Sequence, residues 1–230
     1  MEETLIVDKK LLEKFSNNAV NIFEDYKNKY TNDIIVVSDQ KMYVELAPNK
    51  YMIHLDFSMP INIVEITFIH ELFHCFQKEE GFPNVTAKSC EYSNISNIIS
   101  STILDLDVNE RLNKYGYEHD LNPLRKQIFE CKNKLLFAKE NSDMYKHIQG
   151  LNEYVYTCSI IAFCRMYFNN SIEIKEVLNI TKDNFCNIYK DQNIIYNTIN
   201  LYKYNTPRKV LKIFKKIIPE LELGNYIKIV

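Results

Sequence analysis

Glycine and proline are scarce in this chain of 230 residues, at 4 and 6 residues. That scarcity excludes a linker-rich or low-complexity protein. No run of 18 or more apolar residues occurs, so the sequence predicts no membrane-spanning helix. The first ten residues, MEETLIVDKK, hold acidic residues and no apolar run of signal-peptide length. We therefore expect a cytoplasmic protein with no membrane partner.

An excess of positive charge is also missing, since 28 Lys and Arg stand against 30 Asp and Glu. A net charge of -2 excludes the global basic field that would draw the chain to nucleic acid. The 6 cysteines form no CxxC pair. Without a secretory signal they are interpreted as free thiols, mostly small core residues. What is present is the apolar content of a globular protein, 46% of the residues.

Hydrophobic periodicity predicts both helices and strands in the first part of the chain. Apolar residues at helical spacing predict an amphipathic helix over residues 9–30. A β-branched run predicts a short strand over residues 33–37. Alternating apolar residues over 41–46 and 51–57, separated by a turn signal at 47–50, predict an antiparallel hairpin.

The pattern then changes to the period of a helix. Residues 61–79 form an apolar helical stretch that a Gly and a Pro at 81–83 bring to an end. Asn62 and Glu65 have the spacing of a capping box, whereas Pro60 favours a slightly earlier start of the helix.

The rest of the chain is predicted to be almost entirely helical. One helix is expected over residues 94–113, ending near Gly116. Further helices are expected over residues 123–140, 143–168, 172–190, 191–203 and 207–218. The predicted fold class is therefore α+β, in a single domain over residues 1–230. Residues 1–80 form a small lobe with the β-hairpin and a candidate active-site helix, and residues 81–230 form a mainly helical lobe.

The predicted helix over residues 61–79 contains His70-Glu71-Leu72-Phe73-His74, which fits the pattern H-E-x-x-H. A spacing of four places the two imidazoles on one face, where both can bind one zinc ion at about 2.0–2.1 Å per nitrogen. Glu71 is placed to take a proton from a water that the zinc activates and to pass it to a leaving amine. The chain has only 5 histidines, so the pattern is a rare one by chance. The residues around the motif are apolar, and burying two histidines without polar partners would cost free energy.

A catalytic zinc site needs a third protein ligand and leaves its fourth position to water. The options are Asp105, Asp107 and Glu110, with Glu91 an earlier one, and Asp107 falls off the apolar stripe described next. Asp105 lies in the middle of a helical stripe with apolar ends, which predicts an inward-facing carboxylate that a metal would neutralise. Glu110 belongs to a second apolar stripe and stays a rival, as does Glu91. Asn109, one turn after Asp105, is a candidate to hydrogen-bond a ligand histidine.

Several other polar residues have plainer interpretations. Asp107 and Arg111 are interpreted as a solvated helix face, and His54 as a surface or rim residue of its strand. The basic helical segment at residues 208–216 is interpreted as a solvated outer face, because the whole chain is nearly neutral.

These residues together resemble the zincin superfamily of metallopeptidases, from Tyr51 to about Gly116. The resemblance comprises the strand before the helix, HELFH itself, the Gly-Phe-Pro stop and a following helix with carboxylates. Gluzincin-type members bind zinc through two histidines and a downstream acidic residue with a polar partner four positions later. Asp105 and Asn109 are similar in spacing, with Asp in place of the usual Glu. The third His and the Gly of the metzincin motif are missing after His74.

The resemblance has two further implications. An edge strand near the active-site helix, over residues 41–46 or 51–57, would pair with an extended peptide substrate. A Tyr, His or Arg would stabilise the oxyanion of the tetrahedral intermediate, and His147, Tyr154 and Tyr156 are the candidates.

The expected function is that of a zinc metallopeptidase, a hydrolase with one Zn²⁺ per chain that acts on a peptide or protein substrate. His70, His74 and Asp105 are the expected metal ligands and Glu71 the expected catalytic residue. The alternative is a non-catalytic zinc-binding protein-interaction module on a zincin scaffold. A third interpretation is a helical interaction module that binds no metal.

Overall fold

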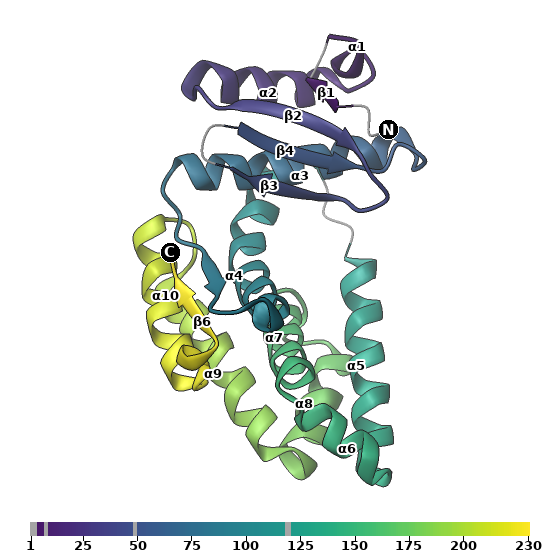
Figure 1. Cartoon of the computed structure of the whole chain (residues 1–230). Helices are drawn as coiled ribbons and strands as arrows, with labels where there is room; N and C mark the ends of the chain where they lie inside the picture. Colours follow the sequence, from purple (N-terminus) through teal and green to yellow (C-terminus); the bar gives the residue numbers. More distant parts are fainter. Residues whose placement is uncertain (1–3, 7–8, 48–49, 118–120) are drawn as a thin grey trace. The chain divides into compact units, whose positions relative to one another are not determined.

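The computed structural model describes residues 4–6, 9–47, 50–117 and 121–230 (Figure 1). Within these ranges the chain is an α+β protein that is mostly helical, as the sequence predicts. It divides into two compact units. Unit 1 comprises Met1–Phe82 and Val108–His119, and unit 2 comprises Pro83–Asp107 and Asp120–Val230.

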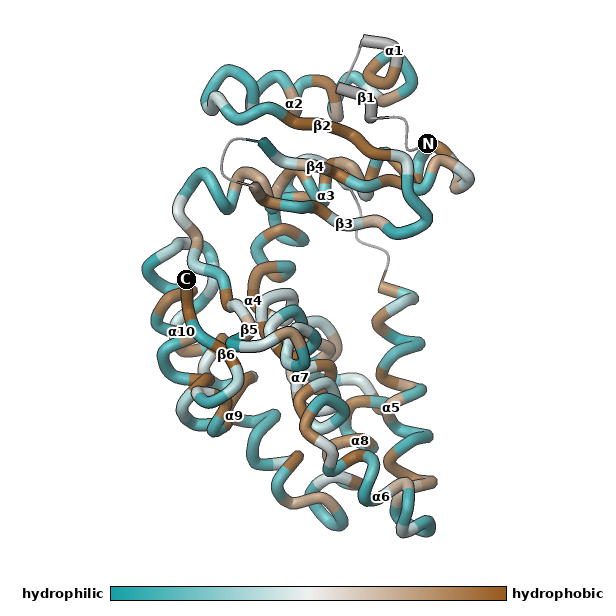
Figure 2. Tube along the Cα trace, viewed as in Figure 1, coloured by the Kyte–Doolittle hydropathy of each residue, from teal (hydrophilic) through white to brown (hydrophobic). Residues whose placement is uncertain are grey.

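Unit 1 contains a four-stranded sheet with the order β1-β2-β4-β3. Its strands are β1 (Thr4–Ile6), β2 (Asp33–Ser38), β3 (Tyr43–Leu46) and β4 (Lys50–Leu55). Strands β2 and β4 are parallel, whereas β1 and β3 run antiparallel to their neighbours. Figure 2 shows the continuous hydrophobic stretch of β2, which suits a strand paired on both sides. Strand β1 was not expected, because three residues carry no readable periodicity.

The predicted hairpin is confirmed in the pairing of β3 with β4. Tyr43 pairs with His54, and Leu46 pairs with Tyr51. The backbone N–H of Ala47 donates to the carbonyl oxygen of residue 50 at 3.1 Å, which closes the connection. The two central positions of the predicted turn, 48 and 49, lie outside the described residues.

The single helix expected over residues 9–30 is wrong, since the chain forms α1 (Lys9–Leu12) and α2 (Asn17–Lys29). The break occurs at Ser16, whose hydroxyl accepts a hydrogen bond from the N–H of Ala19 at 3.2 Å and so caps α2. Serine is a preferred N-cap because its side chain satisfies an amide that the helix leaves unpaired. The apolar residues keep helical spacing across the break, but the cap at Ser16 starts a new helix there.

Helix α3 (Ile61–Glu79) carries the candidate motif and lies in the core of unit 1. Phe68 is fully buried, and its ring lies 5.2 Å from that of Phe15 and 6.0 Å from that of Phe23. The predicted stop is present, with Gly81 at a φ of 79°. This left-handed conformation favours glycine and ends the helix.

The capping box considered for α3 does not form. Pro60 is the N-cap, and no side chain caps the helix. The carboxylate of Glu65 instead accepts hydrogen bonds from the N–H and the hydroxyl of Ser16, both at 2.6 Å, and from the Tyr117 hydroxyl at 3.0 Å. Glu65 therefore ties α3 to the start of α2 and to the segment after the next long helix.

Helix α4 (Ser93–Lys114) is continuous, and the boundary between the two units passes through it. Its final turns belong to unit 1, where Val108 and Leu112 are core residues. The Arg111 guanidinium donates to both carboxylate oxygens of Glu80, at 2.9 and 2.6 Å. These contacts fix the end of α4 against α3 within unit 1.

The described part of unit 2 contains the first part of α4, six further α-helices, two short 3₁₀ helices (Cys90–Tyr92 and Leu223–Asn225) and a two-stranded antiparallel sheet. The helices are α5 (Asn122–Glu140), α6 (Ser142–Gln149), α7 (Leu151–Phe168), α8 (Ile172–Asn184), α9 (Cys186–Tyr202) and α10 (Pro207–Glu220), and the strands are β5 (Val85–Ala87) and β6 (Ile227–Ile229). Among the residues described, no helix has both the length and the apolar character that crossing a membrane requires.

Two sequence expectations for unit 2 need correction, and one element of it was not expected. The helix expected over residues 143–168 is interrupted at Gly150, which separates α6 from α7. The boundary expected at residue 190 lies at Phe185, where the φ of -137° leaves the helical region. Strand β6 was not expected, because its pairing with β5 joins segments more than a hundred residues apart.

Candidate metal centre

Helix α3 presents His70 and His74 on one side, one turn apart. Their ring centroids lie 5.0 Å apart, and the ring planes make an angle of 74°. Both side chains are half-buried, whereas the neighbouring Ile69 and Phe73 are buried in the core of unit 1. The two imidazoles therefore stand at the margin of the apolar core, on a helix whose other sides are held by packing.

The orientation of His74 is fixed by a residue that the sequence reasoning missed. Nδ1 of His74 lies 3.0 Å from Oε1 of Gln77, which is only 2% exposed. Because an amide oxygen can only accept a hydrogen bond, Nδ1 carries the proton and donates it. Nε2 is then the nitrogen that would bind a metal. The spacing of three residues on one helix was the signal in the sequence.

Asp105 reaches the two histidines because it stands on α4, three residues before Val108. Val108 lies in the core of unit 1, and the continuous helix carries Asp105 about 4.5 Å further along its axis. One ligand atom each from His70, His74 and Asp105 lie within 4.8 Å of one another. The structure thus brings together the three residues that the sequence proposed as ligands.

The donor set fits a zinc ion. Four ligands at about 2.0–2.1 Å in a tetrahedron are separated by about 3.3 Å, so atoms within 4.8 Å need only small side-chain rotations to close around an ion. Two imidazole nitrogens and one carboxylate oxygen suit zinc, and other divalent first-row metals accept the same donors. Three protein ligands leave one position open, which is the arrangement of catalytic rather than structural zinc sites.

The two rival ligands have other partners. The carboxylate of Glu110 pairs with the Lys114 ammonium at 2.7 Å on the exposed side of α4. Glu91 is exposed and accepts a hydrogen bond from the Ser89 hydroxyl at 3.2 Å. In the described part of the chain, His70, His74 and Asp105 form the one group of three such residues close enough to share an ion.

Asn109 is 3% exposed, so its stripe on α4 does face inward. The interpretation of Asp107 as a solvated residue is wrong, since it is 5% exposed. Arg111 is partly exposed, and its guanidinium is bound by Glu80 and stands over the Phe82 ring. Periodicity missed the burial of Asp107 because it shows which residues share a helix face, and not which other segments cover that face.

His54 is likewise not a surface residue, being 7% exposed. Its ring stacks on Tyr43 of the neighbouring strand, with centroids 4.1 Å apart and planes at 6°. Nδ1 of His54 lies 3.2 Å from a carboxylate oxygen of Asp39. Alternation along the strand predicted that His54 faces solvent. The Tyr43 ring on the neighbouring strand covers it instead.

Glu71 follows His70 directly and is 9% exposed, so little water competes for its carboxylate. Cys75, one turn later, donates to the backbone carbonyl of Glu71 at 3.4 Å. Burial, and then the charges of Glu71 and Glu79, raise the pKa of the Cys75 thiol well above its usual value. Cys75 is fully buried and is not part of the group of residues close enough to share an ion.

All six cysteines are free, as expected, and four of them are buried. The three candidates for oxyanion stabilisation belong to unit 2. His147 is exposed, and the Tyr154 hydroxyl donates to a carboxylate oxygen of Asp191 at 2.7 Å. Burial is the main cause that raises the pKa of Tyr154. Tyr156 lines a cavity between helices of unit 2.

Comparison of the chain with known family models, with curated proteins and with solved structures gives no match. The function is therefore inferred from the residues of the site and their geometry.

Proposed function

We propose that this chain is a zinc-dependent metallopeptidase of the zincin type, with His70, His74 and Asp105 as ligands to one zinc ion. The observation that carries the proposal is the approach of the Asp105 carboxylate to the H-E-x-x-H imidazoles, with ligand atoms within 4.8 Å. A pair of histidines alone would suit many roles. Two histidines with a third donor from a separate helix are the ligand set of a catalytic zinc site, and the glutamate of the motif is the general base beside it.

A zinc ion bound there supplies Lewis acidity, which polarises the scissile carbonyl and makes water a better nucleophile. Glu71 acts as the general base that accepts the proton of the attacking water. It then acts as the general acid that delivers this proton to the leaving nitrogen. The hydrogen bond from His74 to Gln77 keeps the His74 ring in the tautomer and orientation that the site needs.

The edge position of strand β3 supports a peptide substrate. Strand β4 is paired on both sides, whereas β3 is at the edge of the sheet among the described strands. Of the two strands considered from the sequence, β3 is therefore the one with backbone groups available to an extended peptide. Such pairing favours peptides over other amides or esters, because it recognises successive backbone groups.

The free thiols support a location in the cytoplasm, because a reducing compartment keeps cysteines unpaired. The alternative, a zinc-binding module without catalytic activity, would bind zinc but would not hydrolyse peptides.

Zinc content and peptide hydrolysis test the proposal together. Purified protein should hold about one zinc per chain by mass spectrometry. His70→Ala should lose it, whereas His54→Ala, the matched control at a buried histidine outside the site, should keep it. On a mixed peptide library, Glu71→Gln should retain zinc and lose about 100-fold or more of the activity.

Folded protein without zinc would refute the proposal. Zinc-loaded wild-type protein with no more hydrolysis than Glu71→Gln would replace the enzyme with the zinc-binding interaction module.

A further inference from the structure

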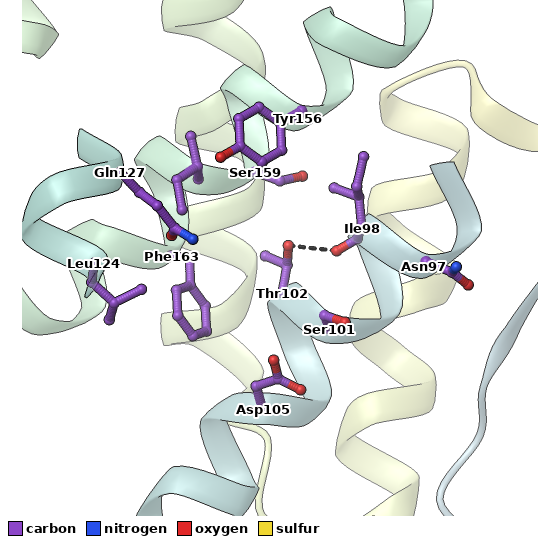
Figure 3. A pocket seen from close by; sticks show the side chains of 11 residues that line it. Asn97, Ile98, Ser101, Thr102, Asp105, Leu124, Gln127, Tyr156, Ser159 and Phe163 are labelled. Atoms are coloured by element: carbon purple, nitrogen blue, oxygen red, sulfur yellow. Dashed lines mark hydrogen bonds between the residues drawn. The ribbon is translucent and has the colours of Figure 1, made fainter. Parts of the chain in front are cut away.

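A cavity of about 340 Å³ lies within unit 2, between α4, α5 and α7 (Figure 3). Its volume falls within the usual range of small-ligand pockets, about 300–1,000 Å³. Apolar side chains from all three helices form much of its wall, among them Ile98, Leu124 and Phe163. The Tyr156 ring also lines it, so the cavity offers flat aromatic surfaces as well as aliphatic ones.

The wall also contains the hydroxyl group of a buried serine. The Ser159 side chain is 1% exposed, and its hydroxyl makes no hydrogen bond with any residue that the structure describes. The other buried hydroxyl of the wall, that of Thr102, donates to the Ile98 carbonyl at 2.7 Å, as the dashed line in Figure 3 shows. A buried hydroxyl without a partner is costly, so a ligand that supplies one gains affinity.

The cavity is connected to the candidate metal centre through one residue. Asp105 lines the cavity and is also the residue of α4 that approaches His70 and His74. Figure 3 shows it one turn from Thr102 along α4, at the end of the group of lining side chains. A ligand in the cavity therefore lies next to the carboxylate proposed to hold zinc.

We propose that the cavity binds the aromatic side chain of a substrate residue adjacent to the hydrolysed bond, with tyrosine preferred over phenylalanine. This inference rests on the proposed function. The aromatic preference follows from the volume and from the Phe163 and Tyr156 rings, since aromatic pairs add to the free energy of burial. The preference for a phenol follows from Ser159, because a site with a buried polar group discriminates against a ligand that leaves it unpaired.

Binding of p-cresol and toluene, which differ by one hydroxyl group, tests the ligand class without any hydrolysis. Calorimetry on the zinc-loaded full-length protein should give p-cresol the higher affinity, by about tenfold. Ser159→Ala should abolish that difference while toluene binds as before. His70→Ala should retain the preference, because the cavity wall contains no residue of α3.

A steric variant provides the second measurement. Gln127→Trp places a large side chain at the cavity wall on α5 and should abolish p-cresol binding. Asn133→Trp is the matched control, since this exposed position on the same helix does not line the cavity. In the peptidase assay, p-cresol should compete with tyrosine-containing peptides, and Ser159→Ala should lower kcat/KM for tyrosine peptides about tenfold relative to phenylalanine peptides.

The possible failures are distinguishable. An active zinc peptidase that binds p-cresol and toluene equally, or neither, overturns the pocket and leaves the proposed function standing. Selective p-cresol binding through Ser159 in a protein that never hydrolyses peptides supports the ligand class and overturns the peptidase.

Discussion

Nδ1 of His74 donates a hydrogen bond of 3.0 Å to the amide oxygen of Gln77, one turn further along α3. The acceptor is buried and lies on the same helix as its donor, so the imidazole cannot rotate without breaking a shielded hydrogen bond. An orientation fixed in this way prepares Nε2 for a metal before the metal arrives.

We predict that Gln77→Leu weakens zinc binding about 10–100-fold, the usual effect of removing a partner of a ligand histidine. Gln77→Glu keeps an acceptor at the same distance and should retain most of the affinity. Competition against a chromogenic chelator measures both constants, and circular dichroism controls for folding. Undiminished zinc affinity in a folded Gln77→Leu protein would show that the bond has no role in metal binding.

The choice between Asp105 and Glu110 as third ligand gives a second prediction. Asp105→Asn should lower zinc affinity by at least tenfold, because a neutral amide is a poorer ligand than a carboxylate. Glu110→Gln should leave zinc affinity unchanged, since that carboxylate pairs with Lys114 on the exposed side of α4. Its effect on stability should be below about 1 kcal/mol, as for other exposed ion pairs. If Glu110→Gln lost more zinc affinity than Asp105→Asn in the chelator assay, Glu110 would be the third ligand in place of Asp105.

The Arg111–Glu80 pair gives a third prediction. Its two hydrogen bonds hold the end of α4 against the end of α3, and both side chains are partly exposed. Arg111→Met keeps most of the aliphatic stem and removes the charge, so we expect a loss of about 1 kcal/mol in the free energy of unfolding. A double-mutant cycle with Glu80→Gln, followed by urea denaturation, isolates the pair. A coupling energy of zero would mean that packing alone holds this end of α4.

A fourth prediction concerns pH and Tyr51, whose hydroxyl donates to a Glu79 carboxylate oxygen at 2.9 Å. Burial, and then this hydrogen bond, raise the pKa of Tyr51 to about 12, while a hydrogen bond from Asn32 opposes the shift. The folded state thus holds the proton more tightly than the unfolded chain, where the pKa is about 10. The associated stability is fully present below pH 10 and is lost as the pH rises to 12.

Wild-type protein should lose about 2–3 kcal/mol more than Tyr51→Phe between pH 10 and 12. Tyr26 and Cys75 also face this group, and the pKa of each is raised by burial. Tyr26 and Cys75 are present in both proteins. The difference in unfolding free energy between the two urea titrations therefore measures the contribution of the Tyr51 hydroxyl. Parallel curves for the two proteins across this window would contradict the assigned shift.

The sequence by itself determined what depends on local spacing. The H-E-x-x-H helix, its end near Gly81 and the β3–β4 hairpin each follow from residues only a few positions apart, whose chemistry acts locally. The same holds for the inward-facing stripe that made Asp105 a candidate ligand, because a helix repeats every 3.6 residues. The free state of the cysteines followed from composition and spacing.

Only the tertiary structure decided what depends on contacts between distant segments. Periodicity could not separate Asp105 from Glu110, since both lie on apolar stripes of α4 and the distinction is which side approaches α3. Nor could it reveal the burial of Asp107, the parallel pairing of β2 with β4, or the pairing of β5 with β6. A side chain's own neighbours in sequence carry no information about which segment will cover it, because long-range packing sets the final environment of each helix face.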